Sequence, residues 1–367
     1  MLSKRNSILL LLLLQLQVSF AQHKLSDYTW GLEGRYKMGF LIAHRAIMGH
    51  VPNGPTHAGE ISLLIRMNGS KSWHYATSFP TLGVTVFAGT VGNSQLLGNF
   101  FGANAFIDFP IIRAKFYQFS GKMACGLGYG SKIYDPITNP KDVAISTHLN
   151  AMIQLGIKSS FTIEKNTLSL ALDMTHFSNG AFKTPNLGIN LPYVSVGFER
   201  IINTAAPLRF TTADAVTPWK KWLFNITAIG SVKEVFPTGG RKYPVFALNT
   251  SARWMAKPKV GMEHGIDFIL KQSIMDYHIE AEKNQWDILQ IGLYSAYLLP
   301  LDQFHFVFGM GVYVKDKYSP EDIFYHRVGM RYYLKNGINI NLSLKSHWAK
   351  ADYVEWGVGY SFRYRKK

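Results

Sequence analysis

The sequence predicts an all-β protein, an antiparallel transmembrane β-barrel built from two halves that each resemble an eight-strand unit. Three observations favour this fold class. Many short segments alternate apolar and polar residues with a period of two, which is the pattern of strands with two different faces. Aromatic residues make up 14% of the chain and glycines number 32, and both are frequent in membrane barrels. After residue 21, no segment approaches the ~20 apolar residues that a spanning helix requires.

The first 21 residues have the pattern of a secretory signal peptide. Lys4 and Arg5 provide the charged start, and Ile8–Leu14 is the apolar run. Ser19–Ala21 is an acceptable cleavage site with small residues at its two ends. A membrane helix is disfavoured because the apolar run is well short of the ~20 residues needed to span a bilayer. We therefore expect export and a location in the cell outer membrane.

The number of cysteines limits the class of protein, and the net charge limits the class of partner. The single cysteine, Cys125, excludes an internal disulfide and hence a disulfide-stapled secreted domain. The net charge of +16 predicts an anionic partner. Nucleic acid is not expected outside the cell, whereas phosphorylated glycolipid is the natural anion at an outer membrane. The alternative is that the positive charge belongs to turns and to the basic C-terminal residues Arg363, Arg365, Lys366 and Lys367.

The first half, residues 22–202, contains eight expected strands. The loops after odd-numbered strands are mostly long, whereas two turns after even-numbered strands, at Ile112 and Glu164, are short. Outer-membrane barrels place short turns in the periplasm and long loops outside. Only the turn at 68–82 is longer than this rule expects. The expected strands are 28–44, 59–67, 83–90, 98–110, 114–129, 148–163, 167–178 and 190–200.

A polar segment at 203–219 is the expected linker on the periplasmic side, and a second half follows at 220–367. Its expected strands are 221–232, 243–255, 261–270, 287–299, 304–314, 324–334, 338–348 and 354–364. The second half weakly repeats the first: G-L-G-Y-G-S-K-I-Y-D-P from Gly126 is echoed by G-M-G-V-Y-V-K-D-K-Y-S-P from Gly309. Such self-similarity predicts the duplication of an eight-strand unit.

Two arrangements of the halves agree with this pattern. They can merge into one barrel of about sixteen strands or form two barrels of about eight, and both counts fall in the known even-numbered range. We expect the single barrel. Two barrels in one chain would need a linker that lets both sit in one membrane, which is the less usual solution.

The most informative stretch is Thr167–Arg200. The even-numbered positions of its first strand form an apolar stripe: Leu168, Leu170, Leu172 and Met174. His176 and Ser178 continue the same face, so a potential base and a potential nucleophile stand at the end of the stripe. In a membrane barrel the apolar face is the outside, so the site is expected to face lipid.

The next strand is expected to pair with this one as a hairpin. Asn190 then lies on the same face and at the same end as His176 and Ser178. His176 and Ser178 are two residues apart on one strand, about 6–7 Å at the backbone. A side-chain hydrogen bond between them is within reach. Asn190 would accept a hydrogen bond from the other imidazole nitrogen, as in Cys-His-Asn enzymes, so the group has the composition of a hydrolase triad.

The connection between the two strands supplies further candidates. Asn179 and Asn186, with backbone N–H groups near Gly180, are candidates for an oxyanion hole. Leu170, Leu172 and Met174, on the apolar stripe that ends at His176, are candidates for substrate binding. The alternative is a polar cluster without chemistry, since His-x-Ser is common by chance and Asn-Gly and Pro-Asn are ordinary turn signals.

A metal site is the competing interpretation of one loop. His44, His50, His57 and Glu60 lie close together in sequence, and these residue types bind metals. Their spacing is not that of a tight ligand set. We therefore prefer a loop that meets lipid phosphates through Arg45, and we expect no metal and no cofactor.

The patterns around the candidate residues match a known family. The chain contains His176-x-Ser178-Asn179 followed by Pro185-Asn186-x-Gly188. This pair of patterns resembles the lipid A 3-O-deacylase (PagL-like) family of outer-membrane barrels, grouped with acyloxyacyl hydrolases, over about residues 25–202. The resemblance implies an eight-stranded barrel with a Ser-His-Glu triad on its outer surface. It also implies metal-free hydrolysis of the ester-linked acyl chain at the 3-position of lipid A.

Carried over to this chain, the resemblance makes Ser178 the nucleophile and His176 the base. The family's glutamate position falls on Asn190, which is a departure. It leaves three alternatives open: a Ser-His-Asn variant, a different acid, or lost activity. Asp173 lies on the wrong face of its strand, and Glu199 lies on the opposite face far down the next strand, so neither is a good substitute.

The second half lacks an equivalent site. Ile338–Leu344 has its apolar residues at even positions, so His347 falls on the inward face together with Lys345 and Asn341. We interpret this half as structural. The expected function is therefore a lipid A ester hydrolase acting on lipopolysaccharide in the outer leaflet. The alternative is a non-catalytic barrel, a pore or a lipopolysaccharide binder, and homodimerisation is left open.

Overall fold

The computed structural model describes residues 27–205, 222–235, 237–257, 259–277, 284–318, 322–348 and 350–363. The signal peptide expected at 1–21 lies outside the described residues, as does most of the linker expected at 203–219. Within the described ranges, no helix combines the length and the hydropathy that crossing a bilayer requires.

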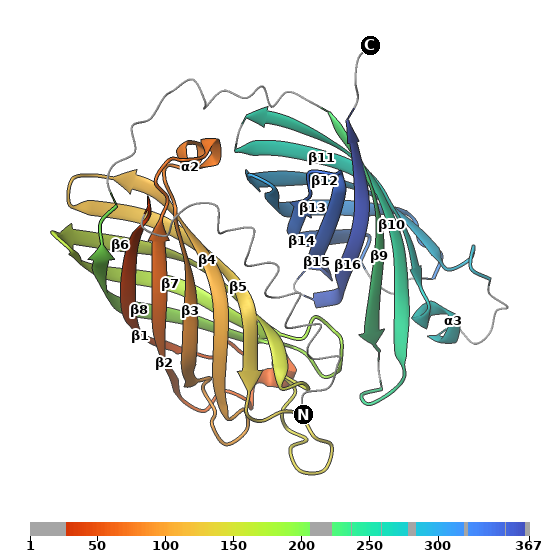
Figure 1. Ribbon diagram of the computed structural model, residues 1–367. Coiled ribbons are helices and arrows are strands. Elements are labelled where there is room, and N and C mark those ends of the chain that lie inside the picture. Colours follow the sequence, from red (N-terminus) through yellow and green to blue (C-terminus); the bar gives the residue numbers. More distant parts are fainter. Residues whose placement is uncertain are drawn as a thin grey trace, which may run out of the picture.

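The fold consists of two closed antiparallel barrels of eight strands each (Figure 1). The first strand of each set pairs with the last strand of the same set. The expected single barrel of about sixteen strands is therefore wrong, although a sheet of that size is possible in principle. Each set completes its own hydrogen-bond ladder, so no free edge remains through which the two halves could merge.

All sixteen expected strands are present. The first barrel consists of β1 (Thr29–Phe40), β2 (Pro55–Arg66), β3 (Thr81–Thr90), β4 (Asn99–Arg113), β5 (Tyr117–Gly130), β6 (Leu149–Ile163), β7 (Asn166–Ser178) and β8 (Ile189–Asn203). The second consists of β9 (Leu223–Glu234), β10 (Lys242–Lys257), β11 (Val260–Lys271), β12 (Leu289–Leu301), β13 (Phe304–Lys315), β14 (Phe324–Tyr333), β15 (Ile338–His347) and β16 (Lys350–Arg363). The short helices are η2 (Ala46–Met48), α2 (Ser72–Ala76) and α3 (Ser273–Tyr277).

Several expected boundaries need correction: β2 begins at Pro55 and not at residue 59, and β16 begins at Lys350 and not at residue 354. β1 ends at Phe40 and not at residue 44, because its partner at that point is Pro55, which has no N–H to continue the ladder. The turn between β2 and β3, which is longer than a barrel turn usually is, contains α2. The end of the first barrel where β1 stops and β8 starts carries the long loops, and we call it the site end.

The strands of the first barrel have one buried and one exposed face. Leu168, Leu170 and Leu172 on β7 are 57%, 57% and 54% exposed, whereas Ser169 and Thr175 on the other face are buried. The predicted faces of β7 are therefore confirmed from Thr167 to Thr175, whereas Ser178 at the end of the apolar face is buried. The same alternation places large apolar side chains on the outside of the neighbouring strands. An apolar exterior around a polar lumen is the pattern of a transmembrane barrel.

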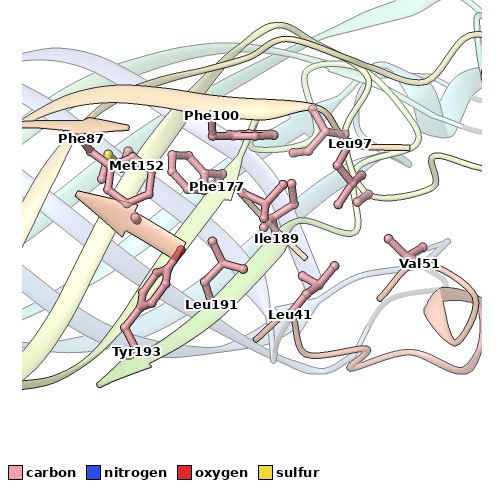
Figure 2. Packing of buried hydrophobic residues seen from close by; sticks show 14 of the residues in the cluster. Leu41, Val51, Phe87, Leu97, Phe100, Met152, Phe177, Ile189, Leu191 and Tyr193 are labelled. Carbon is pink, nitrogen blue, oxygen red and sulfur yellow. The ribbon is translucent and has the colours of Figure 1, made fainter. Parts of the chain in front are cut away.

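Side chains fill the lumen of the first barrel. In the middle, Lys37 contacts Glu60 at 3.0 Å and Asp173 at 2.6 Å. Toward the site end the lumen is closed by an apolar plug (Figure 2). The plug includes Leu41, Val51, Phe87, Leu97, Phe100, Met152, Phe177, Ile189, Leu191 and Tyr193. Eight strands enclose just enough space for such side chains, so this lumen is packed and not an open channel.

The lumen of the second barrel is also occupied by paired charges. Arg327 contacts Glu355 at 2.7 Å and Asp267 at 3.0 Å. His347 is buried there, with Nδ1 3.0 Å from the carbonyl oxygen of Phe324, and Lys345 is fully buried. The predicted inward direction of His347 and Lys345 is therefore confirmed.

Candidate active site

The β7–β8 hairpin places the candidate residues at the site end of the first barrel. His176 lies directly opposite Asn190 in the ladder, and β7 ends two residues later at Ser178. Phe177, between them in sequence, is fully buried in the plug, with its ring 4.9 Å from that of Phe100 (Figure 2). Because side chains alternate along a strand, His176 and Ser178 lie on the face of β7 opposite to the inward-facing Phe177, where His176 is half-buried and Ser178 is buried.

His176 belongs to a chain of three polar side chains. Its Nδ1 lies 2.7 Å from Oδ1 of Asn190. The amide nitrogen of Asn190 in turn lies 3.0 Å from Nδ1 of His44, in the segment that follows β1. Three elements of the barrel thus meet around the Asn190 amide, with an imidazole on each side of it.

Ser178 belongs to a second polar group. The backbone N–H of Gly180 donates to Ser178 Oγ at 3.1 Å, and the Asn186 amide nitrogen donates to the same oxygen at 2.9 Å. Asn186 is fixed in turn, because its Oδ1 accepts a hydrogen bond from the N–H of Asn179 at 3.1 Å. Two donors converge on Ser178 Oγ, and the Ser178 hydroxyl itself donates to Asn186 Oδ1 at 3.3 Å, so its proton is held by Asn186 in this state.

The structure places these two groups next to each other without joining them. His176 contacts Asn190, and Ser178 contacts Asn186 and Gly180, but no hydrogen bond links His176 to Ser178 among the described residues. Ser178 is only 9% exposed. Catalytic hydrogen bonds are often long before substrate binds, so this geometry agrees with a resting site.

The backbone of Gly188 passes close to the His176 imidazole. Its φ is +81°, and a Cβ at this position would lie 2.8 Å from Cε1 of His176. Glycine adopts this conformation without strain, and it also leaves room for the ring. The glycine of the Pro185-Asn186-x-Gly188 pattern therefore determines how closely the connection approaches His176.

The loop between β5 and β6 supports the connection. The N–H of Gly188 donates to the carbonyl oxygen of Ala144 at 3.0 Å, and Asn179 Nδ2 donates to Ser146 Oγ at 3.2 Å. Asp142 shapes this loop, since its Oδ1 accepts from the N–H of Ala144 at 3.0 Å and that of Ile145 at 3.2 Å. Its Oδ2 is buried without a hydrogen-bond partner, and burial raises the pKa of this carboxyl group to about 6.

The other predicted residues lie on the same outer surface or at the same end. Leu170 and Leu172 are exposed, and Met174, next to His176 along the face, is 37% exposed. Arg45 is exposed at the start of η2, one residue after His44.

The four residues considered as metal ligands do not converge. His50 Nε2 contacts the carbonyl oxygen of Lys141 at 2.7 Å, and His57 Nδ1 contacts the Tyr36 hydroxyl at 2.7 Å. Glu60 is buried in the lumen, and His44 contacts Asn190.

Sequence reasoning missed the roles of His44, Gly188 and Ser146 in this arrangement. His44 was visible only as part of a histidine-rich loop, and nothing local indicates that it reaches Asn190, which is 146 positions away. Gly188 was visible as a motif residue, but its contact with His176 depends on the fold of the connection.

Comparison with solved structures gives remote similarities to membrane barrels. Neisserial surface protein A is 10% identical, covers 47% of this chain and 96% of its own, and has a TM-score of 0.32. KdgM porin is 9% identical over 90% of this chain and 99% of its own, with a TM-score of 0.19. A mutant of Rh. blastica porin is 9% identical over 91% and 100%, with a TM-score of 0.17. These scores are too low to support an argument.

Comparison with protein families is decisive, whereas no curated protein sequence matches the chain. The model of the acyloxyacyl hydrolase C-terminal domain matches residues 222–364, which is the second barrel. The model described as lipid A 3-O-deacylase (PagL) matches residues 14–199, which include the first barrel except the end of β8, and the whole candidate site. Together the two matches span nearly all of both barrels. The chain therefore belongs to the lipid A 3-O-deacylase (PagL) family.

Proposed function

We propose that this protein is an outer-membrane serine esterase that removes an ester-linked acyl chain from lipid A. Membership of the lipid A 3-O-deacylase family supports deacylation in general. The apolar exterior of the first barrel supports a position in a bilayer. In this proposal Ser178 is the nucleophile, His176 is the general base and Asn190 holds the imidazole.

The observation that carries the proposal is the contact between His176 Nδ1 and Asn190 Oδ1 at 2.7 Å. An amide oxygen only accepts hydrogen bonds, so Nδ1 must carry the proton and Nε2 is left with a free lone pair. That tautomer is the one a base needs, because Nε2 can then take the hydroxyl proton of Ser178. His44 fixes the direction of the amide, since its Nδ1 accepts from the Asn190 nitrogen.

The reaction follows the usual route of serine esterases. A rotation of the Ser178 hydroxyl toward His176 lets Nε2 take its proton while Oγ attacks the ester carbonyl carbon. The N–H of Gly180 and the amide of Asn186 then stabilise the oxyanion. His176 returns the proton to the departing sugar oxygen, which leaves an acyl group on Ser178. Water, deprotonated by His176, attacks the acyl-enzyme, and the proton it gives up returns to Ser178 as the fatty acid leaves.

The substrate is bound from the outer leaflet. Its acyl chains lie along the exposed stripe of Leu170, Leu172 and Met174, which ends at His176. Burial of apolar surface is not the source of affinity here, because the stripe is already in lipid. The stripe guides the ester to the level of Ser178, and Arg45 is available for a phosphate group at the water interface.

The test is mass spectrometry of lipid A from cells that make the wild type, Ser178→Ala, His176→Ala or the control His57→Ala. His57 is an exposed histidine at the same end that contacts the Tyr36 hydroxyl, so its loss should leave activity intact. We expect loss of one acyl chain with the wild type and the control only. Identical lipid A in all four strains, with folded protein in the membrane, would instead identify a non-catalytic lipopolysaccharide-binding barrel, which Asn190 in place of a carboxylate favours.

A further inference from the structure

The connection between β7 and β8, residues 179–188, touches the second barrel as well as the site, and we call it the site loop. Glu234, the last residue of β9, accepts hydrogen bonds through Oε1 from the Thr184 hydroxyl at 2.9 Å and from the Thr184 N–H at 3.3 Å. The backbone N–H of Glu234 donates to the carbonyl oxygen of Ala181 at 3.2 Å. One residue of the second barrel thus binds the site loop at two points, three residues apart.

Glu234 is held in place for this contact. It is 4% exposed, and the N–H of Gly239 in the β9–β10 turn donates to the same Oε1 at 2.8 Å. A carboxylate that accepts several hydrogen bonds in a protected place keeps one position. The acceptor presented to Thr184 is therefore fixed by the second barrel.

Apolar and aromatic contacts extend the same interface. Gly180 has φ +64°, and a Cβ there would lie 2.4 Å from Cγ2 of Val354 and 3.7 Å from Cδ1 of Leu344. The outer surface of β15 and β16 therefore lies directly against Gly180, whose N–H donates to Ser178 Oγ. Farther along the site loop, Lys242 Nζ lies 3.4 Å from the centre of the Phe182 ring.

We propose that the second barrel is a clamp on the site loop and that Glu234 is its main positioning residue. The loop carries both donors that reach Ser178 Oγ, Gly180 and Asn186, and the clamp contacts lie between them in sequence. A loop of ten residues would otherwise sample many conformations, each with the donors displaced. The second barrel thus has a task in the reaction although it has no triad of its own. This inference rests on the proposed function.

The two barrels also meet at a place that provides a matched control. Lys71, next to α2, pairs with Asp302 in the β12–β13 turn at 2.9 Å. Both side chains are about half exposed, and the pair lies at the end of the first barrel opposite the site loop. Exposed ion pairs contribute little to stability. Asp302→Asn therefore removes an inter-barrel contact without touching the site loop.

The experiment compares the full-length wild type with Glu234→Ala, Glu234→Gln and Asp302→Asn in detergent micelles. The first readout is hydrogen–deuterium exchange of the site loop. The second is the rate of deacylation of purified lipid A, resolved into kcat and KM. Glu234→Gln keeps an oxygen acceptor for Thr184 and Gly239 but removes the negative charge. It therefore tests whether the hydrogen bonds of residue 234, and not its charge, hold the site loop.

We expect Glu234→Ala to speed exchange in residues 180–186 about tenfold, since a buried hydrogen-bond acceptor is lost. Displaced oxyanion donors lower kcat about tenfold or more while KM changes little. In Glu234→Gln, the exchange rate of the site loop and kcat should both stay close to the wild-type values. In Asp302→Asn, both quantities should be unchanged.

Exchange in Glu234→Ala equal to that in Asp302→Asn would overturn the clamp. A faster reaction in Glu234→Ala would also overturn it, because the contact would then restrict access to Ser178. A wild type without deacylase activity would sink the proposed function, and the exchange data alone would then decide whether the second barrel holds the loop.

Discussion

His176 and Asn190 face each other directly across the β7–β8 ladder, with Nδ1 of the imidazole 2.7 Å from the amide oxygen. An acidic residue at this position would hold the ring in the same way and would also stabilise the imidazolium formed during proton transfer. In the proposed reaction, the Asn190 amide can perform the first task only. The rate of the proposed reaction therefore depends on how the neutral Asn190 amide is held by its other neighbour, His44.

Asn190→Glu should raise kcat about tenfold or more, because a charged acceptor strengthens the hydrogen bond to imidazolium. Asn190→Ala should lower kcat about a hundredfold, because the ring loses its fixed tautomer. Both rates are measured by release of fatty acid from purified lipid A. Equal rates in the wild type and Asn190→Ala would rule out a role for this amide.

His44→Ala should lower kcat about tenfold, because the Asn190 amide loses the partner that fixes its direction. His50→Ala is the control, since His50 lies in the same loop and contacts Lys141. The sharper test is the double variant with Asn190→Asp. A carboxylate has two equivalent oxygens, so it needs no partner to fix its direction. His44→Ala should therefore lower kcat much less in the Asn190→Asp background. An equal cost in both backgrounds would mean that His44 acts only through loop stability.

Gly188→Ala should nearly abolish activity. The added Cβ would lie 2.8 Å from His176 Cε1, at a φ of +81° that alanine adopts only with strain. The loss should appear as a drop in kcat of about a hundredfold or more with the barrel still folded, as judged by its heat-modifiable migration on gels. Gly54→Ala is the control, because a Cβ there would meet open space. A fully active Gly188→Ala enzyme would contradict the close approach to the imidazole.

Asp142 makes the loop between β5 and β6 sensitive to pH. Burial raises the pKa of Asp142 from 3.8 to about 6, so the folded loop binds a proton that the unfolded loop has released. The contribution of Asp142 to the free energy of unfolding is greatest below pH 3.8. It falls as the pH rises from 3.8 to about 6. The total fall is about 3 kcal/mol.

Asp142→Asn keeps an Oδ1 acceptor for Ala144 and Ile145 but carries no charge. The variant should therefore lack this fall, and it should be more stable than the wild type near neutral pH. Thermal unfolding in detergent at about pH 4 and about pH 7 measures the difference. A wild type and a variant with parallel pH dependence would contradict a buried ionised Asp142.

Phe177→Ala should destabilise the first barrel by about 3–5 kcal/mol, because it leaves a cavity in the plug beside Phe100. The free energy of unfolding is measured by urea titration in detergent. Val196→Ala is the control: Val196 lies on the neighbouring strand, but its side chain is half exposed on the outer face. A loss no larger than that of the control would show that Phe177 does not anchor the end of β7.

The sequence by itself determined the strands and their faces. A period of two and a hairpin connection suffice to predict that Leu170, His176, Ser178 and Asn190 share one face of the sheet, because side chains alternate along any strand. The burial of Ser178 on that face was not predicted. The same rule placed His347 in the second lumen. The motif residues at 176–188 were enough to identify the family.

Only the tertiary structure decided how the strands close and what surrounds the site. Closure into two barrels depends on which strand edges meet, and alternation of residues is the same in one large barrel as in two small ones. The contacts of His44 with Asn190 and of Glu234 with Thr184 join residues far apart in the chain. They depend on loop conformations and barrel packing, for which a local pattern carries no signal.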